Sequence, residues 1–244
     1  MSTVFVHGVP ETSLVWGPLI DALGVDDPIT LQLPGFGCDR PEGFGSTMDE
    51  YADWLVAQLN AIDGPIHLVT HDWGALLGLR VLAEHPQLAA SWVTDMGNLT
   101  DDFEWHDTAR IWQTPGDGEA FMDGITGASP TDRGALLMSL GIGEAVAMPM
   151  GAQVDATMSD SILRLYRSAT EIGPAWGPGI DKITVPTLVV EATLDAYRRE
   201  GATAELAERI GWETVRLDDA GHWWMTTHAD LAAAALNTFW ASLW

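Results

Sequence analysis

The segment Thr70-His-Asp-Trp-Gly74 holds a carboxylate where a side chain can act as a nucleophile. Residues 66–70 are predicted to form a strand and residues 74–84 a helix, so Asp72 lies on the turn between them. A tight turn of this kind exposes the residue at its tip, and the following helix aims backbone N–H groups at it. Asp is also a favoured helix N-cap, so this segment alone fits either a nucleophile or a cap.

Two side chains further along the sequence favour the nucleophile. Asp195 comes just after a strand predicted over residues 187–191, and His222 lies in a loop after the last predicted strand. The order nucleophile, acid, histidine is the one expected for enzymes that use a strand–turn–helix nucleophile. We therefore predict that Asp72 attacks, that His222 is the general base and that Asp195 orients it. Asp95, which ends the strand after the turn, is a rival for the acid.

The loop His7-Gly-Val-Pro10 follows the first predicted strand and completes the predicted site. Such a loop commonly gives one N–H donor of an oxyanion hole, and the residue after the nucleophile gives the other. We assign these donors to the backbone of Val9 and Trp73, and we expect His7 to support the loop. The other histidines show no metal-ligand spacing, so neither a metal nor another cofactor is expected.

An aspartate nucleophile determines the reactions that the site can perform. Its carboxylate can displace a leaving group from saturated carbon and form an alkyl ester, which a water activated by His222 then hydrolyses. Epoxides and alkyl halides both suit this reaction. An opening epoxide needs a proton donor such as a tyrosine hydroxyl, whereas a departing halide needs only donors such as indole N–H groups.

The elements that must position these residues alternate between strand and helix. Strands are predicted over residues 4–6, 29–33, 66–70, 91–95, 187–191 and 213–217, and helices over residues 13–23, 48–62, 74–84, 202–210 and 229–243. This alternation predicts a mostly parallel sheet covered by helices on both faces. We assign residues 1–96 and 183–244 to this core domain, and residues 97–182, which have no convincing strand, to an inserted helical lid above the site.

The acidic composition limits the partners that the protein can bind. The 244 residues include 35 acidic and 11 basic side chains and carry a net charge of −24. Such a surface repels phosphate backbones and anionic lipid, so neither nucleic acid nor a membrane is an expected partner. No apolar run reaches the roughly 20 residues that span a bilayer. With one cysteine, Cys38, and no recognisable secretion signal, we expect a cytoplasmic protein.

The chain resembles the α/β-hydrolase-fold epoxide hydrolases over nearly its whole length. Residues 7–11 with Trp16 resemble the first loop of that family, and residues 71–74 resemble its nucleophile turn, although haloalkane dehalogenases share both. Two lid motifs discriminate better. Gln113-Thr-Pro-Gly-Asp-Gly-Glu119 resembles the Gln-Glu-Pro-Gly-x-x-Glu segment of the family, and Tyr166-Arg167 resembles the pair that carries one of its two lid tyrosines. The resemblance implies that Tyr166 polarises an epoxide oxygen.

The lid departs from the family at one important place. The family usually has a second lid tyrosine several residues before the Gln-x-Pro-Gly segment, and residues 105–112 contain no tyrosine. Polarisation of the ring oxygen is then expected to rest on Tyr166, aided by His106 or Trp105. We place Trp105, His106 and Trp223 at the substrate pocket, where aromatic side chains suit an apolar substrate.

Two further departures concern the core. The chain begins at the strand that leads into the His-Gly loop, so the two strands that usually precede it are expected to be missing. Thr70 also stands where the family usually has the first glycine of the nucleophile turn. We expect both departures to affect packing rather than chemistry.

We therefore expect an epoxide hydrolase that opens a small apolar epoxide to a diol with water. The alternative is a haloalkane dehalogenase with the same Asp-His-Asp chemistry, in which Trp73 and a lid tryptophan bind the halide. Val9 weighs against this alternative, because many dehalogenases have a polar residue there. A non-catalytic ligand-binding protein on the same scaffold is a third alternative, and the complete set of Asp72, Asp195 and His222 argues against it.

Overall fold

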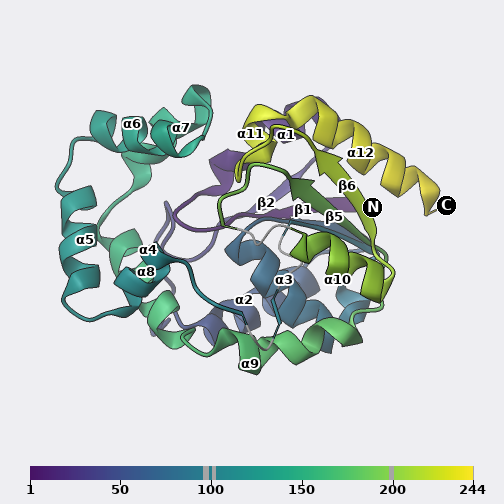
Figure 1. The fold of residues 1–244 in the computed structure, drawn as a ribbon, viewed down its shortest axis with the longest axis horizontal. Coiled ribbons are helices and arrows are strands. Elements are labelled where there is room, and N and C mark those ends of the chain that lie inside the picture. The colour runs from purple at the N-terminus through teal and green to yellow at the C-terminus, as the bar shows by residue number, and fades with distance from the viewer. Residues whose placement is uncertain (96–98, 101–102, 198–200, 244) are drawn as a thin grey trace.

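Six parallel strands form the centre of the protein (Figure 1). The computed structural model describes residues 1–95, 99–100, 103–197 and 201–243. The strands form one sheet in the order β2-β1-β3-β4-β5-β6, and all neighbouring pairs are parallel. They are β1 (Ser2–Val6), β2 (Ile29–Leu31), β3 (Ile66–Thr70), β4 (Ser91–Thr94), β5 (Thr187–Ala192) and β6 (Glu213–Leu217). The predicted parallel sheet is confirmed.

Helices cover both faces of the sheet. One face carries the 3-10 helix η1 (Ser13–Trp16), α1 (Gly17–Leu23), α11 (Trp224–Thr227) and α12 (Ala229–Ser242). The other carries α2 (Met48–Asn60), α3 (Trp73–Glu84), the 3-10 helix η2 (Pro86–Leu88) and α10 (Ala202–Ile210). Figure 1 shows α1, α11 and α12 above the sheet and α2, α3 and α10 below it.

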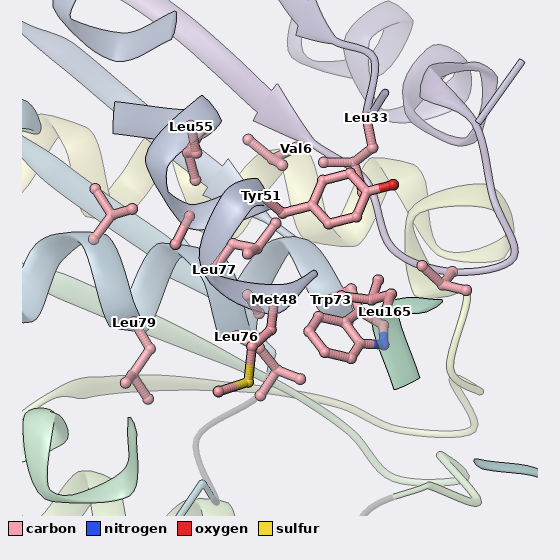
Figure 2. Close-up of a cluster of buried hydrophobic side chains, with 14 of the residues drawn as sticks. Val6, Leu33, Met48, Tyr51, Leu55, Trp73, Leu76, Leu77, Leu79 and Leu165 are labelled. Atoms are coloured by element: carbon pink, nitrogen blue, oxygen red, sulfur yellow. The ribbon is translucent and has the colours of Figure 1, made fainter. Parts of the chain in front are cut away.

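Side chains of each strand alternate between these two layers. Phe5 and Val69 join the core cluster with α1 and α12, whereas Val6 and Leu68 join the cluster with α2 and α3. Figure 2 shows the second cluster, to which α2 contributes Leu55 and α3 contributes Leu76, Leu77 and Leu79. Because helices cover both faces of the sheet, the central strands β1, β3 and β4 are buried at nearly every position, whereas the edge strand β6 is largely exposed.

The predicted strand over residues 29–33 is two residues shorter in the structure. β2 ends at Leu31, and the N–H of Leu33 donates to Nε2 of His7 at 3.1 Å instead of joining the sheet. The other ring nitrogen, Nδ1, is 2.8 Å from the carbonyl oxygen of Gly8. Burial lowers the pKa of His7 to about 4, so the ring is neutral and joins two loops, as we expected for this residue.

The described residues between β4 and β5 form helices and no strand. These helices are α4 (Asp107–Gln113), α5 (Asp117–Thr126), α6 (Pro130–Leu140), α7 (Glu144–Gln153), α8 (Ala156–Ser168), α9 (Ile172–Trp176) and the 3-10 helix η3 (Gly177–Lys182). α6 packs closely on α7, and α8 packs on α4 and α5. Figure 1 shows α4 to α8 beside the sheet, whereas α9 lies below it near α3. The lid boundaries at 96/97 and 182/183 stay a prediction, and Gly97 lies outside the described residues.

The two lid motifs meet in the structure. Arg167 of the Tyr-Arg pair donates from both terminal nitrogens to Glu119 of the Gln-x-Pro-Gly segment, at 2.8 and 2.7 Å. The same carboxylate accepts the backbone N–H of Gly116 at 2.7 Å. This two-point contact joins α8 to the start of α5 and fixes the turn of α8 that carries Tyr166.

In the part of the chain that the structure describes, no helix is long and apolar enough to cross a membrane.

Candidate active site

Asp72 lies at the tip of a strained turn between β3 and α3. Its φ of 50° and ψ of −118° are unusual for a residue with a side chain. A Cβ atom added to Gly74 would lie 2.3 Å from the Val6 carbonyl oxygen, so only glycine allows α3 to start this close to β1. The Asp72 side chain makes no capping hydrogen bond. The N-cap alternative therefore does not describe this carboxylate.

Thr70, which replaces the usual glycine before the nucleophile, is fully buried and hydrogen-bonded. Its hydroxyl donates to the Val93 carbonyl oxygen at 3.2 Å and accepts the Trp92 indole N–H at 2.9 Å. Because this buried hydroxyl has both a donor and an acceptor partner, its hydrogen bonds to the protein replace those it would make to water. The departure at Thr70 is thus accommodated by packing on β4.

One of the two predicted oxyanion-hole donors contacts Asp72. The Val9 backbone N–H donates to Asp72 Oδ1 at 2.8 Å. Among the described residues, no hydrogen bond from the Trp73 backbone N–H to Asp72 accompanies it, so that donor stays a prediction. A Cβ added to Gly8 would lie 2.4 Å from Asp72 Oδ1, which explains why this loop needs glycine beside the carboxylate.

The fold brings the three predicted triad residues together. His222 Nδ1 lies 2.9 Å from Asp195 Oδ2, and His222 Nε2 lies 3.8 Å from Asp72 Oδ2. The second distance is too long for a hydrogen bond, so Oδ2 of the candidate nucleophile keeps its lone pairs for a substrate. The backbone N–H of Tyr197 donates to Asp195 Oδ1 at 2.8 Å and holds that carboxylate in place.

The charges of these three side chains are coupled. Burial raises the pKa of Asp72, and the charges of His222 and His71 oppose that rise. Burial and the charge of His71 act to lower the pKa of His222, but the hydrogen bond and charge of Asp195 and the charge of Asp72 outweigh them and raise it. Burial acts to raise the pKa of Asp195, and its contact with His222 outweighs this and lowers it. The arrangement therefore suits a histidine that accepts a proton.

A second histidine and two carboxylates lie behind the nucleophile. His71 Nε2 is 2.9 Å from Glu11 Oε1, and His71 Nδ1 is hydrogen-bonded to Asp95 Oδ2. All three side chains are buried. Asp95 also accepts the Asp72 backbone N–H at 3.2 Å and the Trp224 indole N–H at 2.7 Å. Asp95, the rival acid, thus contacts His71 and not His222.

The buried cluster is ionic. Burial acts against the charged form of His71, but Asp95 and Glu11 raise its pKa well above the usual range. Burial acts to raise the pKa of Glu11, and the charge and hydrogen bond of His71 outweigh it and lower the pKa to about 2. His71 is therefore a cation between two carboxylates. Glu11, His71 and His222 have ligand-type atoms within 4.8 Å of one another. Because the facing atoms of Glu11 and His71 are already hydrogen-bonded to each other, this group fits an ionic network better than a metal site.

A cavity of about 150 Å³ lies above Asp72 and is bounded by the helices between β4 and β5. Around the nucleophile it is lined by the polar side chains of His106, Tyr166, Tyr197 and His222. The rest of its wall is largely apolar, with Phe121, Met122, Ile125, Leu136, Leu137, Leu140 and Val154. The cavity thus combines polar side chains near Asp72 with a largely apolar wall, as small-molecule binding sites commonly do.

Tyr166 is enclosed by aromatic rings above the nucleophile. Its ring centroid lies 5.4 Å from that of Trp73, 5.0 Å from Trp105 and 4.7 Å from Trp112. Burial raises its pKa well above the usual range, and the negative charge of Asp72 adds to the rise. The hydroxyl is therefore protonated at neutral pH and lines the same cavity as Asp72.

The other predicted pocket residues differ in what they offer a substrate. Trp105 donates its indole N–H to the Ala169 carbonyl oxygen at 2.8 Å and is not among the residues that line the cavity, so its role in binding substrate stays a prediction. His106 lines the cavity and accepts the Ala109 backbone N–H through Nδ1 at 3.2 Å. Burial lowers the pKa of His106, so the ring is neutral and its proton is on Nε2. Trp223 also lines the cavity, but its indole N–H donates to Glu11 at 2.5 Å.

Tyr197 is a pocket residue that sequence reasoning missed. Its ring contacts His222 at a centroid distance of 4.7 Å and His106 at 5.0 Å. Burial raises its pKa, and the charges of Asp72 and Asp195 add to the rise. The sequence feature that could have identified Tyr197 is its position two residues after Asp195, the predicted acid. Glu11 was missed as well, although it belongs to the loop that the resemblance singled out.

Comparisons with known proteins identify the family of the chain. Residues 3–235 match the alpha/beta hydrolase family. A haloalkane dehalogenase of Psychrobacter cryohalolentis is 32% identical over 117 residues, which is 45% of this chain and 38% of that protein. An epoxide hydrolase of Neurospora crassa is 29% identical over 94 residues, which is 36% of this chain and 28% of that protein. The matched part is well under half the length of these curated relatives.

Solved structures extend the likeness of fold to the whole chain. A loop variant of a haloalkane dehalogenase from Bradyrhizobium elkanii has a TM-score of 0.77 at 22% identity, covering 99% of this chain and 90% of that one. An epoxide hydrolase from Vigna radiata has a TM-score of 0.77 at 18% identity, covering 99% and 91%. The sheet, the nucleophile turn and a family match over residues 3–235 lead to one conclusion: this chain belongs to the alpha/beta hydrolase family.

Proposed function

We propose that the protein is an epoxide hydrolase that opens apolar epoxides to diols through an ester on Asp72. The observation that supports this most directly is Tyr166, a protonated, buried hydroxyl in the same cavity as Asp72. Epoxide opening creates negative charge on an oxygen that stays in the product, so it requires a proton donor at this place. Displacement of a halide requires no proton.

In the first step, Asp72 Oδ2 attacks an epoxide carbon. The C–O bond of the ring breaks, and the ring oxygen takes the proton of Tyr166, which leaves a hydroxyl group on the product carbon. Val9 holds Oδ1 at 2.8 Å, so the carboxylate presents its other oxygen to the substrate. The helix N-terminus and His71 favour the ionised carboxylate before attack.

In the second step, water attacks the carbonyl carbon of the Asp72 ester while His222 Nε2 takes a proton from that water. The Val9 N–H then stabilises the oxyanion of the tetrahedral intermediate. Collapse of the intermediate breaks the bond to the substrate oxygen, which takes the proton from His222. The remaining proton from the water returns to the Tyr166 phenolate, so one water and one epoxide give one diol.

Tyr197 and His106 are proposed to provide the second hydrogen bond that a lid tyrosine usually gives. Their rings contact each other at 5.0 Å, and both residues line the cavity with Tyr166. The neutral His106 carries its proton on Nε2, and Tyr197, like any tyrosine at neutral pH, keeps its hydroxyl proton, since burial raises its pKa further above the usual value. Either group can donate to the ring oxygen beside Tyr166.

One observation favours a haloalkane dehalogenase as a second candidate. The indole nitrogens of Trp73 and Trp112 are buried and have no hydrogen-bond partner among the described residues. Trp112 lines the cavity, so its unpaired indole N–H is a donor that a halide could use, and Trp73 directly follows Asp72 in the chain. The haloalkane dehalogenase relatives agree with this candidate as well as the epoxide hydrolase relatives agree with the first.

A matched substrate pair separates the two candidates. We would incubate the protein with 1,2-epoxyhexane and with 1-bromohexane, and measure diol and bromide separately. Release of diol alone is expected, and the Asp72→Asn variant should release neither product. Bromide release without diol would replace the first candidate by the second. If neither product forms, and neither the epoxide nor the bromide alkylates Asp72, the aspartate mechanism itself is wrong.

A further inference from the structure

Arg133 differs from every other described arginine in its partners. Seven arginines lie within 4.0 Å of a carboxylate: Arg40, Arg80, Arg110, Arg164, Arg167, Arg209 and Arg216. Arg133 has no such contact with a described residue, although the chain has 35 acidic side chains. In a protein with a net charge of −24, an arginine that remains without a carboxylate calls for an explanation.

The contacts of Arg133 are with neutral carbonyl oxygens. Nε donates to Gly151 at 2.9 Å, and Nη1 donates to Thr126 at 3.0 Å and to Ala128 at 3.3 Å. Guanidinium has five N–H donors, so these bonds leave the two donors of Nη2 without a described partner. The carbonyls hold the head group in place but do not neutralise its charge. Arg133 is thus a fixed cation with donors to spare.

Arg133 lines the cavity that contains Asp72. It lies on α6 with Leu136, Leu137 and Leu140, which form part of the apolar wall. Leu136 and Leu140 are 42% and 44% exposed, so this part of the cavity reaches the surface of the lid. The reacting groups of Asp72 and His222 are on the core domain instead. A ligand that fills the cavity therefore borders Asp72 and His222 of the core and one lid cation, Arg133.

We propose that Arg133 binds a carboxylate at the far end of the substrate, so that the substrate is an apolar chain with a reacting group at one end and a carboxylate at the other. The reacting group rests on the proposed function, whereas the carboxylate rests on Arg133 alone. The apolar side chains that line the same cavity fit the chain. A monoanion is favoured over a phosphate dianion because the net charge of the protein penalises each added negative charge.

The alternative is that Arg133 only braces the lid. Its bonds to Thr126 and Gly151 join the end of α5 to α7, and a brace needs no ligand. A brace and a binding site predict different results. Loss of a brace weakens binding of charged and neutral ligands alike and lowers the melting temperature, whereas loss of a binding site weakens binding of the charged ligand selectively.

Binding of unreactive ligands tests the proposal without any turnover. Decanoate and 1-decanol, which share one chain, would be titrated by calorimetry into the wild type, Arg133→Gln and Arg133→Lys. We expect decanoate to bind the wild type more tightly than decanol, and Arg133→Gln to weaken decanoate roughly tenfold or more while decanol changes little. Arg133→Lys should keep part of the preference. Arg164→Gln, an exposed arginine on α8 outside the cavity, is the matched control and should change neither ligand.

Three results would overturn the proposal. The first is equal binding of decanoate and decanol to the wild type. The second is an equal loss of affinity for both ligands in Arg133→Gln together with a lower melting temperature, which would show that Arg133 only braces the lid. The third is tighter binding of decyl phosphate than of decanoate, which would reject the carboxylate.

Turnover then separates this proposal from the proposed function. The substrates are 10,11-epoxyundecanoic acid and its methyl ester, and Arg133→Gln should lower kcat/KM roughly tenfold for the acid but not for the ester. If neither epoxide reacts while the decanoate preference holds, the proposed epoxide chemistry fails and the carboxylate site stands. If both react equally and Arg133→Gln changes neither, the carboxylate site fails and the epoxide chemistry stands.

Discussion

Two histidine–carboxylate clusters lie side by side in this protein, with the rings of His71 and His222 4.5 Å apart. His222 with Asp195 borders the cavity. His71 with Glu11 and Asp95 is enclosed behind the nucleophile. The residue types are the same, and two histidines this close would repel each other if both were protonated. Each therefore needs its own carboxylates to set its charge.

The difference lies in how many carboxylates each histidine contacts and in access to the cavity. Both nitrogens of His71 face carboxylates, so the ring is held as a cation and has no free lone pair. Only Nδ1 of His222 is hydrogen-bonded, and its Nε2 faces Asp72. A base needs a nitrogen that is free to accept a proton. We infer that the first cluster positions the nucleophile turn and that the second performs the proton transfer.

The largest effect is expected for His222→Gln. This variant should still be alkylated by an epoxide but should hydrolyse the ester at least about 10⁴-fold more slowly, because the base is gone. Intact-protein mass spectrometry should show one added substrate, and peptide mapping should place it on Asp72. His71→Gln, at the enclosed ring, should not accumulate the ester. An unmodified His222→Gln protein that still forms diol would reject the two-step mechanism.

The paired substitutions Asp195→Asn and Asp95→Asn test the comparison directly. Asp195→Asn should lower turnover by roughly 10⁴-fold, the scale known for a triad acid, with a small change in melting temperature. Asp95→Asn removes one partner of a buried ion pair and should destabilise the fold by about 3 kcal/mol, the low end for such pairs because Glu11 remains. For a chain of this size that is a loss of roughly 6–12 °C in melting temperature.

The reverse pattern would exchange the roles of the two clusters. If Asp95→Asn keeps its melting temperature and loses turnover while Asp195→Asn remains active, Asp95 is the functional acid. Folding of each variant is checked by circular dichroism before kinetics are measured.

Tyr166→Phe is expected to have the next largest effect. It removes the proposed acid and keeps the ring that packs on Trp73 and Trp112. Single-turnover alkylation by an epoxide should slow by roughly 10²-fold, the usual contribution of a positioned acid. Tyr51→Phe is the matched control, because the Tyr51 hydroxyl donates to the Pro34 carbonyl oxygen at 2.6 Å and does not line the cavity. An unchanged rate in Tyr166→Phe would move the proposal to the dehalogenase.

Much of the fold could be predicted from the sequence because each element has a strong local pattern. The capping box of Thr47 and Glu50 starts α2 as its residue types predict. The nucleophile turn is similarly local, since strand, turn glycine and helix follow one another within residues 66–84. Contacts between distant side chains could not be predicted in this way. The ring of Tyr197 reaches the cavity only because the loop after β5 turns toward His222.

The orientation of single side chains could not be predicted from the sequence either. Trp105 was expected at the substrate, but the backbone at Ala169 accepts its indole N–H. Composition cannot show which carbonyl will lie opposite an indole. The ionic partner of Asp95 posed the same problem, because a strand-end carboxylate beside the nucleophile fits either histidine. Only the three-dimensional arrangement separates His71 from His222.

A smaller effect is expected in the pH dependence of ester hydrolysis. The pKa of His222 is raised above its usual value of 6.5 by Asp195 and Asp72, against the effects of burial and His71. A base must be deprotonated, so the hydrolysis rate should rise with pH through the pKa that His222 has in the ester, where Asp72 is uncharged and Asp195 is the carboxylate that raises this pKa. Stopped-flow measurement of ester decay in Asp195→Asn should show this pKa at a lower pH, since that variant loses a group that raises it. A pKa that stays the same in Asp195→Asn would break the link between Asp195 and His222.

The smallest effect is expected for Tyr197→Phe. Its ring contacts His222 and His106, so the variant keeps the packing and loses one proposed hydrogen bond to the epoxide oxygen. Tyr197 is half-buried, and water can partly replace its hydroxyl, so epoxide alkylation should slow only about tenfold, the scale of one hydrogen bond. Alkylation by a halide of the same chain should not change, because no oxygen anion forms. A double variant with Tyr166→Phe should lose more than either single variant if both hydroxyls contact one oxygen. A Tyr197→Phe protein that slows the epoxide and the halide equally would instead show that Tyr197 only positions His222.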